Sequence, residues 1–179
     1  MHSIELLPDE MTNRAVGEVW CRLLNDGLPS LAAHRHPTNR PHLTLATAVD
    51  LAPEVRLSLA RALAVLPIPL HLDGTLRFTG RTNVLAWAVL PEAALLRLHE
   101  TVWRTLYDSA GCGRLNPIHS PERWKPHVSL ARGRDAGWTG SDAELFSQES
   151  GEPAGVLAGQ WVSARTYDSV VRSTDRLGP

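Results

Sequence analysis

Two seven-residue segments of the chain repeat the same order of residue types, and this repeat constrains the fold more than any other feature. Arg40–Ala46 reads RPHLTLA and Lys125–Ala131 reads KPHVSLA. Both run basic, Pro, His, aliphatic, hydroxyl, Leu, Ala, and they lie nearly half the chain length apart. One such segment would carry little weight, because His and Thr two positions apart are common on strands. Two segments that agree at seven consecutive positions indicate two related strands.

Both segments are typical of β-strands with one buried face, because side chains two positions apart on a strand point to the same side of the sheet. The polar side carries His42, Thr44 and Ala46 in the first segment, and His127 and Ser129 in the second. The core side carries Leu43, Leu45 and Thr47 in the first, and Val128 and Leu130 in the second. If the two strands lie side by side about a local two-fold axis, both histidines and both hydroxyls line one cleft.

Two facing histidines suit acid–base chemistry, since an unperturbed imidazole titrates at a pH of about 6.5. A neutral ring can accept a proton from water and a protonated ring can donate one to a leaving oxygen, each role typically worth ~10²–10⁴ in rate. The hydroxyls of Thr44 and Ser129 can donate to phosphate oxygens as negative charge builds. The pattern predicts a metal-free site for displacement at a phosphodiester.

Two other interpretations of the repeat are weaker. Two ordinary half-buried strands with satisfied histidines would explain either segment alone, but explain the matched pair poorly. A zinc site needs three or four ligands, and neither segment supplies a carboxylate or a cysteine.

The rest of the chain indicates an α+β fold with antiparallel sheet. Apolar residues at helical spacing predict three helices, over about residues 9–27, 52–66 and 91–111. Short apolar runs between turn residues predict seven or eight strands, namely 3–7, 41–49, 68–72, 75–79, 84–90, 124–131, 156–164 and 166–173. Asp73-Gly74 is expected to be a turn, and residues 133–155 a loop with one helical turn at Asp142–Phe146.

Length and charge favour one domain over residues 1–179, with two lobes sharing a core. The 18 basic and 19 acidic residues give a formal net charge of −1, which argues against a long nucleic-acid track but allows one phosphate in a local pocket. The apolar stretches are too short to span a membrane, and the first residues lack the apolar run of a secretory signal. Cys21 and Cys112 lie outside any zinc or disulfide spacing. We expect a cytoplasmic monomer without metal or cofactor, with Cys21 in the core.

The two motifs resemble those of the two-histidine (2H) phosphoesterase superfamily, and within it the bacterial 2′-5′ RNA ligase and 2′,3′-cyclic phosphodiesterase branch. The hallmark of that family is two copies of His-x-Thr/Ser-x about half a chain apart, here His42-Leu-Thr44-Leu and His127-Val-Ser129-Leu. The similarity extends to IELLPDE, LRFTGRTNVLAWAVLP, LLRLHETVWRTL and WKPHVSLAR. It covers most of residues 3–132.

The resemblance implies a bilobal α+β fold with pseudo-two-fold symmetry, in which two antiparallel sheets with helices outside enclose a central cleft. It also implies hydrolysis of a 2′,3′-cyclic phosphodiester, on an RNA 3′ end or a small cyclic nucleotide, to a phosphomonoester. His42 and His127 would be the acid–base pair, with Thr44 and Ser129 binding the phosphate. The motif does not fix the two roles, and our working hypothesis is that His42 protonates the leaving oxygen while His127 activates water.

Three further residues are candidate substrate contacts. Arg132 follows the second motif and either holds phosphate or is a surface arginine. Trp124 and Phe78 either stack on a base, as aromatic side chains do in single-strand recognition, or pack within strands. The loop histidines either lie at the surface or contact ligand at the mouth of the cleft: His34, His36 and His119.

Two alternative functions use the same groups. A 2′-5′ RNA ligase would join a cyclic phosphate end to a 5′-hydroxyl, which requires a second polynucleotide nearby; the near-neutral charge gives no sign of the basic track this needs. A binding module would sense a cyclic nucleotide or RNA end without turnover, but the intact histidines and hydroxyls argue against lost catalysis.

Overall fold

A computed structural model describes residues 1–134 and 156–178. The main elements are β1 His2–Pro8, α1 Glu10–Asn25, β2 Leu43–Ala48, α2 Pro53–Ala62, β3 Ile68–Phe78, β4 Asn83–Val89, α3 Ala93–Tyr107, β5 His127–Gly133, β6 Leu157–Asp168 and β7 Ser173–Leu177. Four single-turn 3-10 helices add to these, including η1 Leu31–Ala33 and η4 Pro117–His119. The α+β class and the three helices agree with the sequence-based prediction.

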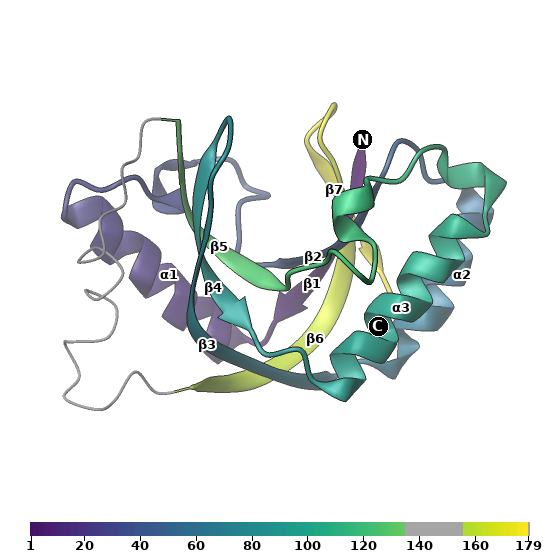
Figure 1. Cartoon of the computed structure of the whole chain (residues 1–179), viewed down its shortest axis with the longest axis horizontal. Helices are drawn as coiled ribbons and strands as arrows, with labels where there is room; N and C mark the ends of the chain where they lie inside the picture. The colour runs from purple at the N-terminus through teal and green to yellow at the C-terminus, as the bar shows by residue number, and fades with distance from the viewer. Residues whose placement is uncertain (135–155, 179) are drawn as a thin grey trace.

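The strands form one antiparallel sheet in the order β1-β2-β5-β4-β3-β6-β7, and β1 also pairs with β6. Six strands therefore close into a ring, with β7 added at β6. The two expected sheets are joined, because β6 pairs with β3 near its start and with β1 along the rest of its length. The sheet consequently has two limbs, one containing β3, β4 and β5 and the other β1, β2, β6 and β7, which open on one side (Figure 1).

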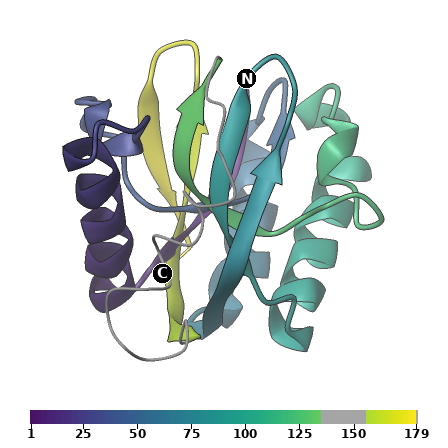
Figure 2. The same ribbon diagram turned by 60° about the vertical axis from the view of Figure 1, so that its left-hand side comes forward.

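The helices cover the outside of this sheet. Figures 1 and 2 show α1 on one side, with α2 and α3 packed together on the other. Each helix buries one apolar stripe, which in α1 consists of Val16, Val19, Trp20 and Leu23 and in α3 of Leu95, Leu98, Val102 and Leu106. Burying one such side chain contributes about 1.5–3 kcal/mol. The Asp9 carboxylate caps α1 by accepting from the backbone N–H of Thr12 at 2.8 Å.

Two local predictions in the first half of the chain were wrong. Cys21 is exposed, because successive residues on a helix are turned by about 100° and it follows the buried Trp20 out of the stripe. Asp73-Gly74 is not a hairpin turn but a bulge within β3, where the register against β4 shifts between Leu72 and Thr75 and Gly74 has φ +70°.

The C-terminal strands also differ from expectation. The break predicted after Ala164 is absent, since β6 continues to Asp168 and the chain reverses before β7. The helical turn expected at Asp142–Phe146 lies outside the described residues.

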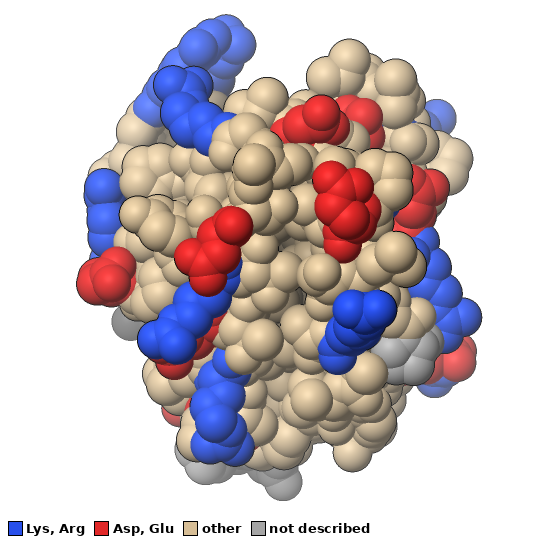
Figure 3. Space-filling view, turned by 90° about the vertical axis from the view of Figure 1, so that its right-hand side faces the viewer, with Lys and Arg blue, Asp and Glu red and all other residues tan. Residues whose placement is uncertain are grey.

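The outer face over α2 and α3 carries both signs of charge. Figure 3 shows Lys and Arg interspersed with Asp and Glu, without a continuous basic stripe. This face therefore lacks the long track of positive charge that binding an extended phosphate backbone requires.

No helix within residues 1–134 and 156–178 combines the length and the apolar character needed to cross a membrane.

Candidate active site

A cavity of about 580 Å³ lies between the two limbs of the sheet. It has the size of a typical small-molecule site. Its lining comes from strands β1, β2, β4, β5 and β6, from the end of β3, and from the loops before β2 and β5. Six of the seven predicted site residues are in this lining: His42, Thr44, His127, Ser129, Arg132 and Phe78.

The two motifs meet at a single cross-strand pair. Leu43 on β2 is the antiparallel partner of Val128 on β5. In an antiparallel pair the residue before one partner lies on the side of the residue after the other. His42 therefore lies on the side of Ser129, and Thr44 on the side of His127, which is the local two-fold relation that the repeat predicts.

A β-bulge in each motif strand brings a third side chain to the cavity. Against β1, Ile4 pairs with Ala46 and the next residue, Glu5, pairs with Thr44, so one residue of β2 is extra. The alternation of faces reverses there. Ala46 is fully buried and Thr47 lines the cavity, which corrects the sequence-based prediction for both.

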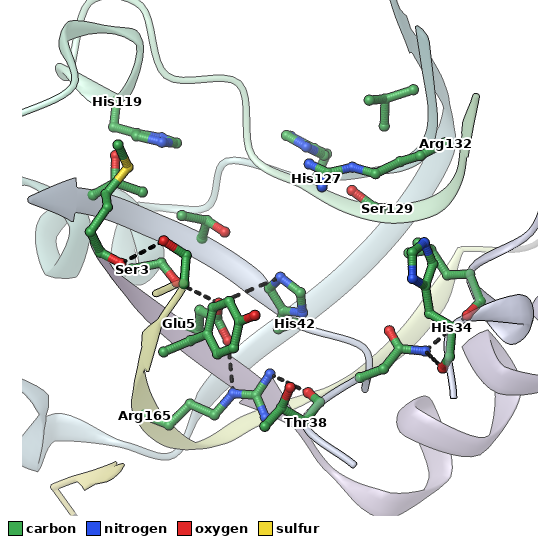
Figure 4. A pocket seen from close by; sticks show the side chains of 18 of the residues that line it. Ser3, Glu5, His34, Thr38, His42, His119, His127, Ser129, Arg132 and Arg165 are labelled. Atoms are coloured by element: carbon green, nitrogen blue, oxygen red, sulfur yellow. Dashed lines mark hydrogen bonds and ion pairs between the residues drawn. The ribbon is translucent and has the colours of Figure 1, made fainter. Parts of the chain in front are cut away.

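The same irregularity recurs in the second motif. The register of β4 against β5 shifts, so that Leu85 pairs with Ala131 and Ala86 with Ser129. Arg132 therefore lies on the same face as His127 and Ser129, although strict alternation would place it on the opposite one. Figure 4 shows its side chain beside His127.

Both histidines are held by the same local hydrogen bond. Nδ1 of His42 lies 2.8 Å from the carbonyl oxygen of Arg40, and Nδ1 of His127 lies 2.7 Å from that of Lys125. A carbonyl oxygen only accepts, so each Nδ1 carries the proton. Nε2 is then the nitrogen that exchanges protons, with a free lone pair when the ring is neutral and an N–H when it is charged.

The surroundings of His127 favour its neutral form. Burial lowers its pKa, and the positive charges of Arg132 and His42 lower it further, although the hydrogen bond to Lys125 acts in the opposite direction. Its ring also contacts Phe78, with 4.6 Å between centroids. Phe78 therefore lines the cavity while packing on a motif histidine.

His42 has a different neighbour, the buried carboxylate of Glu5. Glu5 Oε1 lies 3.7 Å from His42 Nε2, and Oε2 accepts from Arg165 Nε at 2.7 Å. Figure 4 shows these groups on one side of the cavity. Neither Glu5 nor Arg165 was predicted from the sequence, although a charged residue inside the apolar run IELL was a usable signal.

Trp124 is the predicted site residue that does not line the cavity. Its ring stacks on His99, with centroids 3.7 Å apart and planes 2° from parallel, and its indole N–H donates to the Thr44 carbonyl at 3.0 Å. Trp124 thus packs beneath the first motif instead of facing a ligand.

His34 and His36 are exposed, as expected, and both line the cavity together with His119. His119 is half-buried, and burial together with nearby His99 and His127 lowers its pKa to about 4. It is therefore uncharged at neutral pH. Proximity of η4 to the cavity is a tertiary property that the loop sequence does not encode.

The described residues contain no group of three His, Cys, Asp or Glu side chains arranged to hold a metal ion. The polar side chains that line the cavity are instead imidazoles, hydroxyls, one amide, one carboxylate and two guanidinium groups.

Comparison with known proteins agrees with this geometry. A family model described as the 2′-5′ RNA ligase superfamily matches residues 8–161, which include both motifs. The chain belongs to the 2′-5′ RNA ligase superfamily. This membership confirms the resemblance to the 2H phosphoesterases seen in the sequence, and proteins of this superfamily are phosphoesterases and ligases.

Solved structures similar to this superfamily member share its fold. TT0787 of Thermus thermophilus is 19% identical with a TM-score of 0.58, covering 98% of this chain and 94% of that one. Kluyveromyces marxianus Usb1, solved with uridine monophosphate, is 15% identical with a TM-score of 0.55, covering 98% and 97%. E. coli LigT, solved with phosphate, is 16% identical with a TM-score of 0.50, covering 98% and 91%. No curated protein sequence gave a significant match.

Proposed function

We propose that this protein hydrolyses a 2′,3′-cyclic phosphodiester, on an RNA 3′ end or a small cyclic nucleotide, to a phosphomonoester without a metal ion. The observation that carries the proposal is the matched pair of Nδ1-to-carbonyl hydrogen bonds on His42 and His127. These bonds leave both Nε2 atoms for proton exchange in one cavity. An acid–base pair of this kind is what displacement at a phosphodiester needs.

The roles follow from the charges around each ring. His127 is neutral near pH 7 because its pKa is lowered, so its Nε2 accepts a proton from the attacking water. A bond forms between the water oxygen and phosphorus, and the bond from phosphorus to one ribose oxygen breaks. His42, when protonated, gives its Nε2 proton to that leaving oxygen, and the two rings then exchange protons with solvent.

The remaining side chains bind the phosphate. The hydroxyls of Thr44 and Ser129 line the cavity and would donate to its non-bridging oxygens, and Arg132 would supply a positive charge on the His127 side. Donors fixed before the reaction stabilise the charge that builds in the transition state. The cavity volume suits one nucleotide-sized ligand better than two polynucleotide ends.

Support also comes, at the level of fold, from neighbours whose solved structures contain uridine monophosphate or phosphate. Both ligands carry the phosphate chemistry that the cavity here would bind.

The test is incubation of the full chain with 2′,3′-cyclic nucleotides and with cyclic-phosphate-ended oligoribonucleotides, in EDTA, followed by ³¹P NMR. We expect one monoester regioisomer, and loss of turnover in His42→Ala and His127→Ala that still show the wild-type circular dichroism. A folded wild-type protein that turns over none of these substrates would refute the proposal. Including a 5′-hydroxyl oligoribonucleotide in the assay detects ligation, and nucleotide binding without turnover would favour the sensing alternative.

A further inference from the structure

We propose that Glu5 is a positioning residue for His42: its carboxylate, fixed by Arg165 and Ser3, is the counter-ion that keeps His42 as the proton donor of the pair. The inference rests on the proposed function, because it assigns the acid role within that same site. Glu5 and Arg165 belong to neither motif.

Glu5 is a carboxylate held inside the protein. Only 3% of it is exposed, and a buried charge is unfavourable unless other groups compensate it. Its Oε2 accepts from Arg165 Nε at 2.7 Å and its Oε1 accepts from Ser3 Oγ at 2.6 Å. Glu5 and Arg165 are also cross-strand partners between β1 and β6, so the backbone fixes the pair.

Arg165 is fixed in turn. It is 7% exposed, and its second guanidinium nitrogen donates to the Thr38 carbonyl at 2.9 Å. The ion pair therefore links β1 and β6 to the loop that enters the first motif.

The fixed carboxylate faces the reactive nitrogen of His42. Glu5 Oε1 lies 3.7 Å from His42 Nε2, too long for a hydrogen bond but close enough for strong attraction between opposite charges in a partly buried site. Nδ1 already donates to the Arg40 carbonyl. The proton that Glu5 stabilises is thus the Nε2 proton, which is the one a leaving oxygen would receive.

His127 has no comparable partner. Glu5 is the one carboxylate among the described residues that line the cavity. The neighbours of His127 are the Phe78 ring, the Arg132 guanidinium and His119, which is neutral at pH 7. The two motif histidines therefore have neighbours of opposite charge, a carboxylate beside His42 and a guanidinium beside His127.

The other titratable or charged groups around His42 do not duplicate this role. They are Arg40 on its own segment, Arg165 and Tyr167 on β6, His127 and Arg132 on β5, and His34, His36 and His119 on the loops. None of these groups is negatively charged at pH 7, so none of them favours a positive charge on His42. Arg165 offsets part of the Glu5 charge but binds Oε2, which leaves Oε1 toward the ring.

Glu5→Gln tests the role, because it keeps the size of the side chain and removes its charge. We expect the alkaline limb of kcat/KM for 2′,3′-cyclic AMP to move to lower pH, giving about tenfold extra loss at alkaline pH, while the acid limb stays in place. Glu5→Asp, which keeps the charge, should restore much of that limb.

Glu92→Gln is the matched control, because Glu92 Oε1 lies 2.7 Å from Nδ1 of His71, away from the cavity. It should leave kcat/KM and both limbs of its pH profile unchanged. If Glu5→Gln does not fold because Arg165 loses its partner, Glu5→Gln combined with Arg165→Gln removes both buried charges and should show the same shift of the alkaline limb to lower pH.

An unmoved alkaline limb in a folded Glu5→Gln or double variant, measured against an active wild type, would overturn the role of Glu5. A wild type without turnover would instead refute the proposed function, and it would be detected before any variant is made.

Discussion

Trp124 donates its indole N–H to the backbone carbonyl of Thr44 at 3.0 Å. Trp20, on α1, donates in the same way to the carbonyl of Ser129 at 3.1 Å. Each motif hydroxyl residue is therefore held from behind by a tryptophan distant in sequence. The pseudo-symmetry of the two motifs extends to the residues that support them.

Replacing either tryptophan by phenylalanine should weaken both stability and activity. The change removes the donor and leaves a carbonyl unpaired, which costs about 1–3 kcal/mol when the group is buried. A small movement of the hydroxyl it supports should lower kcat several-fold. Urea unfolding and steady-state kinetics measure the two effects, with Trp103→Phe on α3 as a control expected to leave kcat near wild type. Unchanged kcat in both Trp20→Phe and Trp124→Phe would contradict the supporting role.

The motif hydroxyls should contribute mainly to the chemical step. Thr44→Val and Ser129→Ala each remove one phosphate donor, and loss of one such donor typically lowers kcat by roughly 10²-fold. Single-turnover rates with 2′,3′-cyclic AMP measure the effect. Thr101→Val, on the exposed face of α3, is the control for the same kind of substitution. If KM alone changed, the hydroxyls would contribute to ground-state binding only.

The enzymatic activity, measured as kcat/KM against pH, should persist below pH 6.5. The proton acceptor must be neutral to accept a proton. Burial, and then the charge of Arg132, lower the pKa of His127. The acid limb of kcat/KM should therefore lie below the ordinary histidine pKa of about 6.5. Arg132→Gln removes one of the causes and should move this limb to higher pH, besides raising KM for the phosphate. Rate profiles from about pH 4.5 to 9, which bracket the ordinary histidine value, test both expectations.

Arg104→Gln is the matched control for that charge change, because Arg104 pairs with Glu100 on the surface of α3. It should leave the acid limb where it is. An acid limb in the wild type above pH 6.5 would argue against His127 as the proton acceptor.

Stability should fall as the pH is lowered toward 4, in part because of His119. Burial and two nearby histidines lower the pKa of His119 from 6.5 to about 4. As the pH falls, the imidazole therefore binds a proton near pH 6.5 in the unfolded chain but only near pH 4 in the folded chain. The free energy of unfolding decreases across that window. The full pKa shift lowers the free energy of unfolding by at most roughly 3 kcal/mol.

Urea unfolding of wild type and His119→Gln at pH 7 and pH 4.5 isolates this contribution. The wild type should lose more stability between the two pH values than the variant, by roughly 2 kcal/mol. Equal losses would show that His119 is accessible to protons in the folded protein.

The local sequence accounts for much of the fold and for the centre of the site. Helical spacing placed α1, α2 and α3, because an amphipathic helix needs only a stripe of apolar residues to bury. The repeated motif predicts that His42, Thr44, His127 and Ser129 face one cleft, and all four line the cavity. It also accounts for the imidazole orientation, since each ring bonds to a carbonyl two residues earlier in its own motif.

Long-range contacts decided what local patterns could not. Bulges in β2 and β5 placed Thr47 and Arg132 in the cavity against the two-residue alternation, because register depends on the neighbouring strand. The Glu5–Arg165 pair joins opposite ends of the chain.

The two motifs are thus nearly equal in sequence and unequal in the folded protein. The sequence by itself determined that two histidines and two hydroxyls face one cleft. Only the tertiary structure gave His42 a carboxylate and His127 a guanidinium and an aromatic ring. The physical reason is that charge and burial around a side chain come from whatever packs against it: Glu5 and Phe78 lie on other strands, and the register of β5 against β4 decides that Arg132 faces the cavity.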